Sequence, residues 1–265
     1  NPPNIFPFFF QNSAIFVLLR HKTHEFMLTK TKAVVLRTLK YGDSQVIADM
    51  LTQTHGRLSF IQRIPKTARA GVRKQLLQPL SVLDLVFDYR QNANLLRIKE
   101  ASMAYPLSSI PLDAYKLSIA MFVAEFTHFA TRSEQDNAPL FQYITNSIMW
   151  LDACRGAFSN FHIVYMMHLT RFVGFYPNLD NCTGNAYFDL RSGCFTAGQP
   201  SHNDFLKPDE ASRIATLMRM RYETMFSFSR NERNRCVELI LKYYRLHVPD
   251  FPELKSTGVL QELFV

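Results

Sequence analysis

The spacing of hydrophobic residues changes near residue 105, and this change limits the possible folds more than any other feature. Between Thr31 and Ser102, turn residues separate short runs of β-branched and aromatic residues, a pattern typical of strands. From Pro111 onward, apolar residues recur every three or four positions, which is typical of helices. The sequence therefore predicts a β domain followed by a helical domain.

Five strands are expected in the first domain. They are Thr31–Leu39, Gln45–Thr52, Leu58–Ile64, Ser81–Tyr89 and Leu95–Ser102. Gly56, between the second and third strands, can adopt the positive φ that a tight hairpin requires. Five short strands with a long loop between the third and fourth predict an OB-fold barrel over residues 27–105.

Five helices are expected in the second domain, residues 106–265, and a short element, Ser256–Leu263, closes it. The helices are Asp113–Arg132, Ala138–Ala153, Asn160–Gly174, Pro208–Arg221 and Asn231–His247, with Gly174 as a helix stop. Between about residues 176 and 205, Pro, Gly, Asn and Asp interrupt the pattern and predict an irregular insert. The expected fold class is thus α+β and multidomain, with an OB-fold barrel followed by an all-helical domain that carries this insert.

Positive charge is concentrated in the first domain. The chain has 30 Lys and Arg against 22 Asp and Glu, a net charge of +8 and a pI near 9.4. Residues 28–74 hold ten basic and two acidic residues, whereas residues 101–265 hold 15 basic and 16 acidic residues. A basic first domain on a nearly neutral body favours a polyanionic partner such as nucleic acid.

The cations expected to contact phosphates lie on this domain and on its long loop. Between Arg63 and Lys74, basic residues recur every three or four positions among Pro, Gly and small residues, with no carboxylate nearby in the sequence, which is typical of a flexible arm. A solvated basic loop without a partner is the alternative. The predicted nucleic-acid-binding residues are Lys32, Arg37, Lys40, Arg57, Arg63, Lys66, Arg69, Arg73 and Lys74. Tyr41, Phe60 and Tyr89 are candidates either for base stacking or for the barrel core.

Two of the four cysteines, Cys182 and Cys194, lie in the insert. A structural zinc needs four N or S ligands, usually from two Cys-x-x-Cys pairs. Asn185 and Ala197 stand where the second cysteine of each pair would be, so we expect two free thiols and no metal or other cofactor. A mixed site completed by Asp180 and His202 is the alternative.

The sequence lacks the common catalytic motifs. It contains no phosphate-binding Gly-rich loop, no His-Glu-x-x-His, no Gly-x-Ser-x-Gly and no clustered acids for two-metal chemistry. His162 and His168 lie six apart in one expected helix, which is not a ligand spacing. We therefore do not expect an enzyme.

Residues 1–26 are expected to lie outside the fold, with Met27 as a possible start; a hydrophobic strand or hook packed on the body is the alternative. The apolar run Ile5–Leu19 has neither the basic start nor the cleavage site of a signal peptide, and it is shorter than the roughly 20 residues that span a bilayer. Four cysteines in a chain of this size fit a reducing compartment. We therefore expect a cytoplasmic protein without a membrane partner.

Several stretches, in this order, resemble the bacterial recombination-mediator family RecO. They are Ala33–Arg37, Tyr41–Ser44, Leu51–Thr52, His55–Ser59, the basic loop that follows, Leu77–Leu80, Phe172–Cys182 and Leu254–Ser256. The resemblance covers Met27 to about Leu263. Each stretch is weak alone, but their combination is specific.

The resemblance implies a protein of DNA repair and homologous recombination. It implies binding to single- and double-stranded DNA, annealing of complementary strands, and work at the nucleoid with RecR and single-stranded-DNA-binding protein to load RecA. Many members carry a four-cysteine zinc site, of which only the first and third positions, Cys182 and Cys194, are matched here. Two alternatives are an OB-fold adaptor that binds proteins and an RNA-associated factor, since an OB-fold does not by itself distinguish RNA from DNA.

Overall fold

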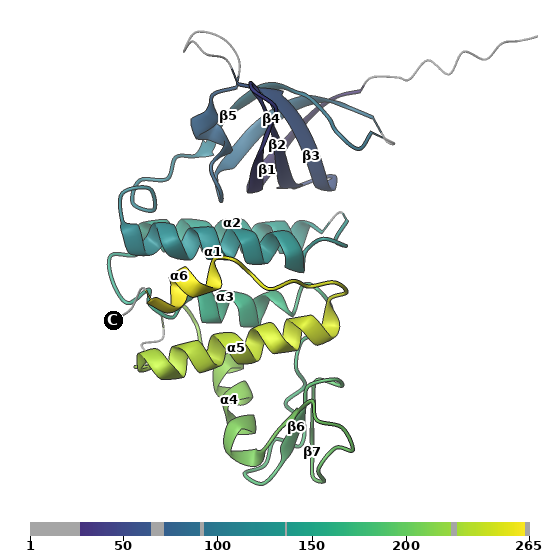
Figure 1. Cartoon of the computed structure of the whole chain (residues 1–265), viewed down its shortest axis with the longest axis vertical. Helices are drawn as coiled ribbons and strands as arrows, with labels where there is room; N and C mark the ends of the chain where they lie inside the picture. Colours follow the sequence, from purple (N-terminus) through teal and green to yellow (C-terminus); the bar gives the residue numbers. More distant parts are fainter. Residues whose placement is uncertain (1–26, 65–71, 91–92, 136, 224–226, 263–265) are drawn as a thin grey trace, which may run out of the picture.

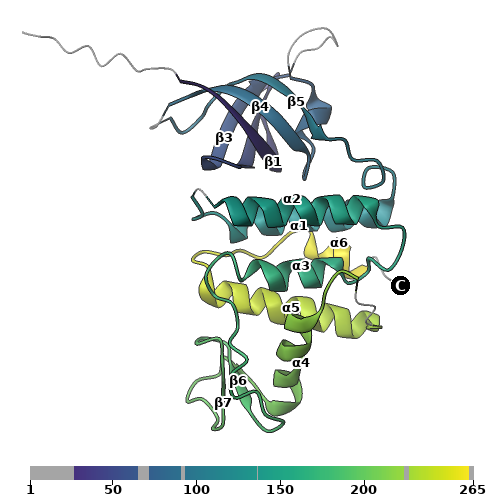
Figure 2. The same ribbon diagram turned by 180° about the vertical axis from the view of Figure 1, so that it is seen from behind.

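The chain forms a sheet domain and a helical domain that are stacked along the long axis of the molecule (Figure 1). Figure 2 shows the same two parts from behind. The computed structural model describes residues 27–64, 72–90, 93–135, 137–223 and 227–262. The expectations about the first 26 residues therefore lie outside the described residues.

Five strands form the sheet domain, close to where the sequence predicts them. They are β1 (Met27–Tyr41), β2 (Gln45–Thr52), β3 (Gly56–Arg63), β4 (Val82–Tyr89) and β5 (Ile98–Tyr105). They pair antiparallel in the order β3-β2-β1-β4-β5. The first half of β1 pairs with β4 and its second half with β2, which explains its length of 15 residues.

The two edge strands also meet, so that the sheet curls around its own interior. Phe60 of β3 and Leu96, just before β5, form a parallel bridge. The amide of Ile61 donates to the carbonyl of Leu96 at 2.9 Å, and the amide of Leu96 donates to the carbonyl of Ser59 at 2.9 Å. The interior is one apolar cluster, to which the short 3-10 helix η1 (Lys74–Leu77) contributes Leu77. The sequence pattern did not predict η1.

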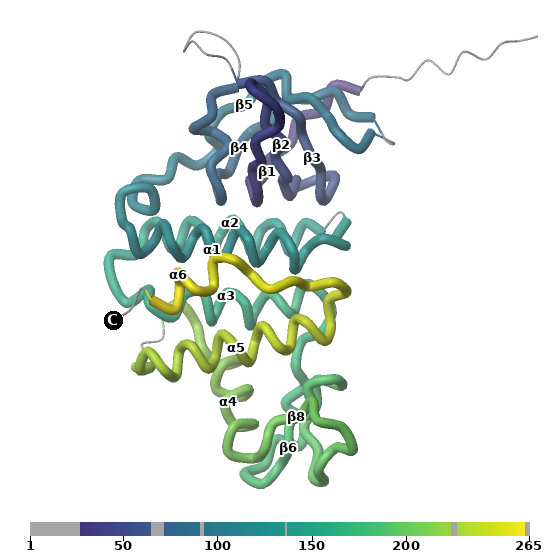
Figure 3. The backbone as a smooth tube through the Cα atoms, viewed as in Figure 1, coloured from purple at the N-terminus to yellow at the C-terminus, as the bar shows by residue number. Residues whose placement is uncertain are grey.

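Six helices follow. They are α1 (Ala114–Ala130), α2 (Ala138–Ala153), α3 (Phe161–Leu169), α4 (Pro208–Arg219), α5 (Arg230–His247) and α6 (Thr257–Glu262). Side-chain caps start three of them: Asp113 accepts from two amides of α1, Asn137 accepts from one amide of α2, and Ser229 forms a capping box with Glu232 at α5. The chain turns back after α5, so that α6 lies beside α1 (Figure 3). None of the described helices is long and apolar enough to cross a membrane.

Helix α3 ends five residues before Gly174, the predicted stop. The amide of Arg171 donates to the carbonyl of His168 and the amide of Phe172 donates to that of Leu169, so the backbone tightens to i to i−3 bonds after α3. Gly174 does adopt a positive φ of 88°, but in the turn that follows. The end of α3 is thus set by this tightened turn.

The sheet and the helices share a hydrophobic core. Val34, Leu36 and Leu51 face outward from the barrel interior and belong to the same buried cluster as the helices. Gly56 brings the β2–β3 turn against the segment before α2: a Cβ at this position would lie 2.6 Å from the backbone of Gln135. Gly56 has a φ of +60°, as predicted, so this position needs glycine for both its conformation and its neighbour.

The insert is not irregular throughout. It holds three short strands, β6 (Tyr187–Asp189), β7 (Cys194–Thr196) and β8 (Phe205–Leu206), in a sheet of order β7-β6-β8. The description of the second domain as all-helical is therefore corrected. Strands of two or three residues are too short to show a period of two, which is why the sequence pattern missed them.

Candidate nucleic-acid interface

Two of the predicted cations, Lys40 and Lys74, line one groove on the sheet domain. The groove has a volume of about 590 Å³ and lies between the β1–β2 turn and η1. Its walls also contain the polar residues Ser44, Gln45 and Gln78, which a search for charge alone did not single out. We call it the arm groove, because Ile64, the last described residue before the basic loop, also lines it.

Arg63 and Arg73 stand at the two ends of that loop. Both side chains are exposed, and Arg73 directly precedes η1. Lys66 and Arg69 fall within residues 65–71 and lie outside the described residues. Neither arginine lines the arm groove itself, but their neighbours in the chain, Ile64 and Lys74, do.

The positive charge of the arm groove is not cancelled by ion pairs. Within the described ranges, no ion pair forms on Lys40, Arg63, Arg73 or Lys74. One carboxylate, Asp43, does line the groove. The sequence of the loop contains no acidic residue, as expected, but the fold brings Asp43 close to the cations. Cations without ion pairs are available to a phosphate backbone.

Arg37 lines a neighbouring groove of about 500 Å³ between the sheet and α1. The two grooves share Thr38 and Pro79, so they meet at one point. Lys255, just before α6, lines the same groove as Arg37. This basic residue was not among those predicted, because it lies about two hundred residues away in the sequence.

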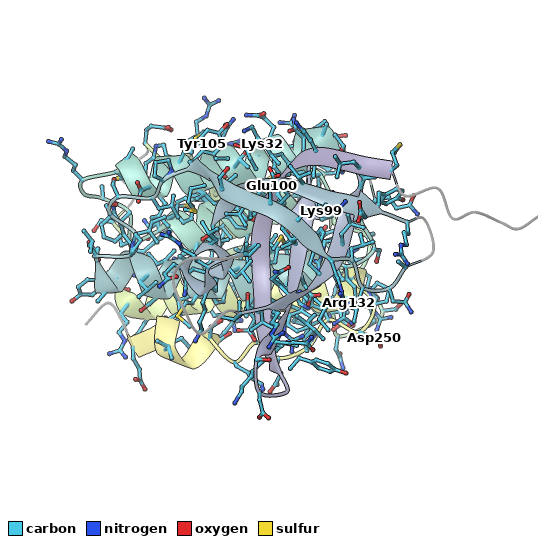
Figure 4. All side chains as sticks on the ribbon, turned by 90° about the horizontal axis from the view of Figure 1, so that it is seen from above. Lys32, Lys99, Glu100, Tyr105, Arg132 and Asp250 are labelled. Atoms are coloured by element: carbon cyan, nitrogen blue, oxygen red, sulfur yellow. The ribbon has the colours of Figure 1, made fainter. Side chains whose placement is uncertain are left out.

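Lys32, in contrast, is neutralised. Its ammonium lies 2.7 Å from the Asp84 carboxylate and 5.4 Å from the centroid of the Tyr105 ring. Figure 4 shows Lys32 and Tyr105 close together in the view from above. The register of β1 against β4 places Lys32 opposite Asp84. Lys99 is paired in the same way, 2.7 Å from Asp88, so this face of the sheet is one of mixed charge.

Arg57 points to the helical domain. Its guanidinium donates to the His128 carbonyl at 2.8 Å, to Thr131 Oγ1 at 3.2 Å and to His128 Nδ1 at 3.0 Å. Burial lowers the pKa of Arg57 to about 10, with Asp49 opposing the shift, so Arg57 stays protonated at neutral pH. The structure therefore places Arg57 in the junction between the domains and away from the arm groove.

His128 is neutral in this junction. Burial, together with the Arg57 charge, lowers the pKa of His128 to about 4. Its Nδ1 accepts from Arg57, so Nδ1 carries no proton and its 3.7 Å approach to Asp49 is not an ion pair. Asp49 instead accepts a hydrogen bond of 2.6 Å from Ser59. The neutral imidazole of His128 thus lies between the Arg57 cation and the Asp49 carboxylate, and Arg37 and Arg132 add further positive charge nearby.

The three stacking candidates differ in exposure. The Phe60 side chain is fully buried in the barrel interior and cannot stack on a base. Tyr89 is half-buried, with its ring 4.5 Å from that of His55. Tyr41 is 53% exposed and follows Lys40 at the end of β1. Tyr41 is therefore the best placed of the three to meet a base beside the arm groove.

The cysteines of the insert are free thiols. Cys182 is exposed and Cys194 is half-buried. In the part of the chain that the structure describes, no three His, Cys, Asp or Glu side chains are grouped so as to hold a metal ion. Asp180 accepts from Asn178, and His202 binds Asp189. The donor set therefore does not fit a structural zinc, and the zinc content of the protein stays a prediction.

Polar contacts tie the insert together and to α5. Asp204 accepts from Arg191 through Nε at 2.9 Å and Nη2 at 2.8 Å, and Lys242 of α5 lies 3.3 Å from the same carboxylate. His202 Nε2 lies 3.3 Å from Asp189. These contacts, with the buried ring of Phe188, hold the insert in place.

Two family models match consecutive parts of the chain. Residues 27–107 match the family described as recombination protein O, N terminal, and residues 111–257 match recombination protein O, C terminal. The first match corresponds to the sheet domain and the second to most of the helical domain. The chain is thus a recombination protein built from these two domains.

Similar proteins carry the same family name. A DNA repair protein RecO of Phocaeicola vulgatus is 51% identical over 240 residues, which are 90% of this chain and 100% of that relative. DNA repair proteins RecO of Bacteroides fragilis and Porphyromonas gingivalis are 49% and 30% identical, again over 90% of this chain and all of each relative. The chain belongs to the RecO family of DNA repair proteins, which confirms the resemblance seen in its sequence.

Proposed function

We propose that this protein binds single- and double-stranded DNA through the arm groove and anneals complementary strands. The observation that carries the proposal is the arm groove itself, in which Ile64 and Lys74 mark the two ends of the basic loop, and in which Lys40 and Lys74 form no ion pair with any described residue. The curled five-stranded sheet, with β3 meeting β5, supports an OB-fold, a fold that binds single strands.

The mechanism is electrostatic. Two phosphate backbones held against one positive surface repel each other less, because the cations replace the counterions that each strand releases. Base pairing then proceeds without ATP and without any chemical step, so the protein is not an enzyme. Contacts of this kind carry no base information, so the binding is independent of sequence.

In the cell, the protein acts as a recombination mediator in the bacterial cytoplasm. We infer that it works with RecR on DNA coated by single-stranded-DNA-binding protein and helps to load RecA. Membership of the RecO family supports this role. The nearly neutral helical domain is the surface on which we place these protein partners.

A matched pair of double variants tests the DNA site. Lys40→Gln with Lys74→Gln removes two cations from the arm groove, and Lys32→Gln with Lys99→Gln removes two that are already paired with carboxylates. In titrations of labelled oligonucleotides over a range of salt, the first variant should flatten the plot of log K against log salt by about 1.4–1.8. The control should leave it nearly unchanged.

Annealing is measured with the same variants. Complementary oligonucleotides, bare or coated with single-stranded-DNA-binding protein, should anneal faster with the native chain and the control than with the arm-groove variant. Equal salt slopes for both variants would remove the arm groove from the proposal. A preference for RNA strands of the same sequence would favour the RNA-associated alternative.

A further inference from the structure

A second cationic hollow lies in the helical domain. Its volume is about 430 Å³, and three arginines line it: Arg171 just after α3, Arg219 at the end of α4, and Arg221. Tyr143 of α2 and Tyr176 also line it. We call this hollow the arginine pocket. The net charge of the second domain is close to zero, so the sequence alone did not indicate this local positive charge.

The arginine pocket is positive. None of its lining residues is acidic, and Glu223, the next acidic residue along the chain, does not line it. Two helices end here, and a helix C-terminus carries about half a negative charge. Two such ends together offset about one positive charge, which leaves the charge of a second arginine in the lining. Arg171 and Arg221 both act on His168, whose pKa is lowered first by burial and further by these two charges.

A flat aromatic surface borders these charges. The Arg171 guanidinium lies over the Tyr176 ring, 5.5 Å from its centroid, and Tyr176 is 41% exposed. Behind it, the Tyr143 ring stacks on Phe172 with centroids 4.8 Å apart, and its hydroxyl donates to the Tyr165 carbonyl at 2.9 Å. The aromatic floor is therefore held rigidly while Tyr176 faces solvent.

Arginines beside an exposed aromatic ring form the chemistry that binds single-stranded nucleic acid. A guanidinium group donates two parallel hydrogen bonds to two oxygens of one phosphate. Guanidinium planes and tyrosine rings also stack on unpaired bases. An acidic peptide would pair with the arginine cations, but its carboxylates would not stack on the exposed Tyr176 ring. The combination therefore favours a nucleotide over a peptide.

We propose that the arginine pocket binds a phosphate and an unstacked base of a single DNA strand, as a second strand site separate from the arm groove. No residue of the sheet domain lines the pocket, so the two sites are built independently. The proposal rests on the DNA binding proposed above, and it adds a second place on the chain, besides the arm groove, at which an unpaired strand is held. One chain could then present two strands at once.

Crosslinking tests the site directly. The full chain is irradiated with an eight-nucleotide thymine strand that carries 5-iodouracil, and crosslinked peptides are identified by mass spectrometry. We expect a crosslink at Tyr176 in the native chain and in the arm-groove variant. Arg171→Gln with Arg219→Gln should reduce this crosslink at least tenfold, whereas Arg245→Gln, an exposed arginine of α5 outside the pocket, should leave it unchanged.

Parallel anisotropy titrations with the same strand separate the two proposals. Binding with crosslinks only on the sheet domain would overturn the second site and keep the arm groove. No binding at all would overturn both. An Asp-rich hexapeptide that removes the Tyr176 crosslink at a tenth of the strand's concentration would assign the pocket to acidic peptides. An equal loss of this crosslink with inorganic phosphate would show that the pocket is a site for small anions only. Either result overturns the proposal.

Discussion

Replacing Arg57 should destabilise the protein without weakening its binding to DNA. The Arg57 guanidinium makes three hydrogen bonds across the domain junction, two of them to His128 and one to Thr131. A hydrogen bond from a charged donor contributes about 1.5–3 kcal/mol, and groups left buried without a partner add to the loss. The glutamine amide can still donate one hydrogen bond, so two of the three are lost. Because Arg57 is half-buried, we take the lower end of about 1.5 kcal/mol for each and expect Arg57→Gln to cost about 3 kcal/mol.

Thermal unfolding followed by circular dichroism measures this loss. For a chain of this size, 1 kcal/mol lowers Tm by about 2–4 °C, so the expected drop is about 6–12 °C. Arg57→Lys keeps the charge and part of the hydrogen bonding, so it should lie between the native chain and Arg57→Gln. Lys74→Gln serves as the opposite control, because Lys74 is exposed and lines the arm groove.

The two variants should give opposite results. Lys74→Gln should weaken DNA binding at low salt and leave Tm within about 1 °C, whereas Arg57→Gln should do the reverse at a temperature at which it is folded. The reasoning fails if Arg57→Gln lowers DNA affinity as much as Lys74→Gln while Tm stays unchanged. Arg57 would then act on DNA, as its place in the basic sequence suggested.

Three further predictions concern stability. Gly56→Ala should lower the free energy of unfolding in urea by at least about 2 kcal/mol, and Gly42→Ala by about 1 kcal/mol. Both glycines have a positive φ, but only at Gly56 would the new Cβ lie 2.6 Å from another backbone atom. Equal losses for the two variants would contradict this close approach. Burial lowers the pKa of His128 to about 4 and that of His162 to about 3, from about 6.5 in the unfolded chain. The unfolded state therefore binds more protons below pH 6.5, and stability should fall as pH drops from 6.5 to 4, by up to about 2 kcal/mol for each histidine at pH 5; unfolding free energies that do not change over this range would refute it. Metal analysis should find no stoichiometric zinc, and a chelator should leave Tm unchanged. Asp204→Asn should lower Tm, because it removes the charge that pairs with Arg191 and Lys242. One zinc per chain would contradict the prediction and show a site that the donor set does not suggest.

Local signals in the sequence determined most of the secondary structure. The alternation in Ser81–Tyr89 predicted β4, because a half-buried strand repeats every two residues, and the bounds of β2 and α2 matched those expected. The positive φ of Gly56 was also predicted, since the requirement lies within one turn. Family membership followed from several short stretches in order, which do not depend on knowing their contacts.

Only the tertiary structure decided which charges are available. Lys32 and Asp84 are 52 residues apart and meet because β1 and β4 pair in one register. Arg57 has the same charge as Lys74 but faces α1, because the β2–β3 turn packs on the helical domain. The arginine pocket likewise forms where the ends of α3 and α4 converge. Charge is a property of one residue, but its neutralisation depends on neighbours that are distant in sequence, so only the folded chain determines it.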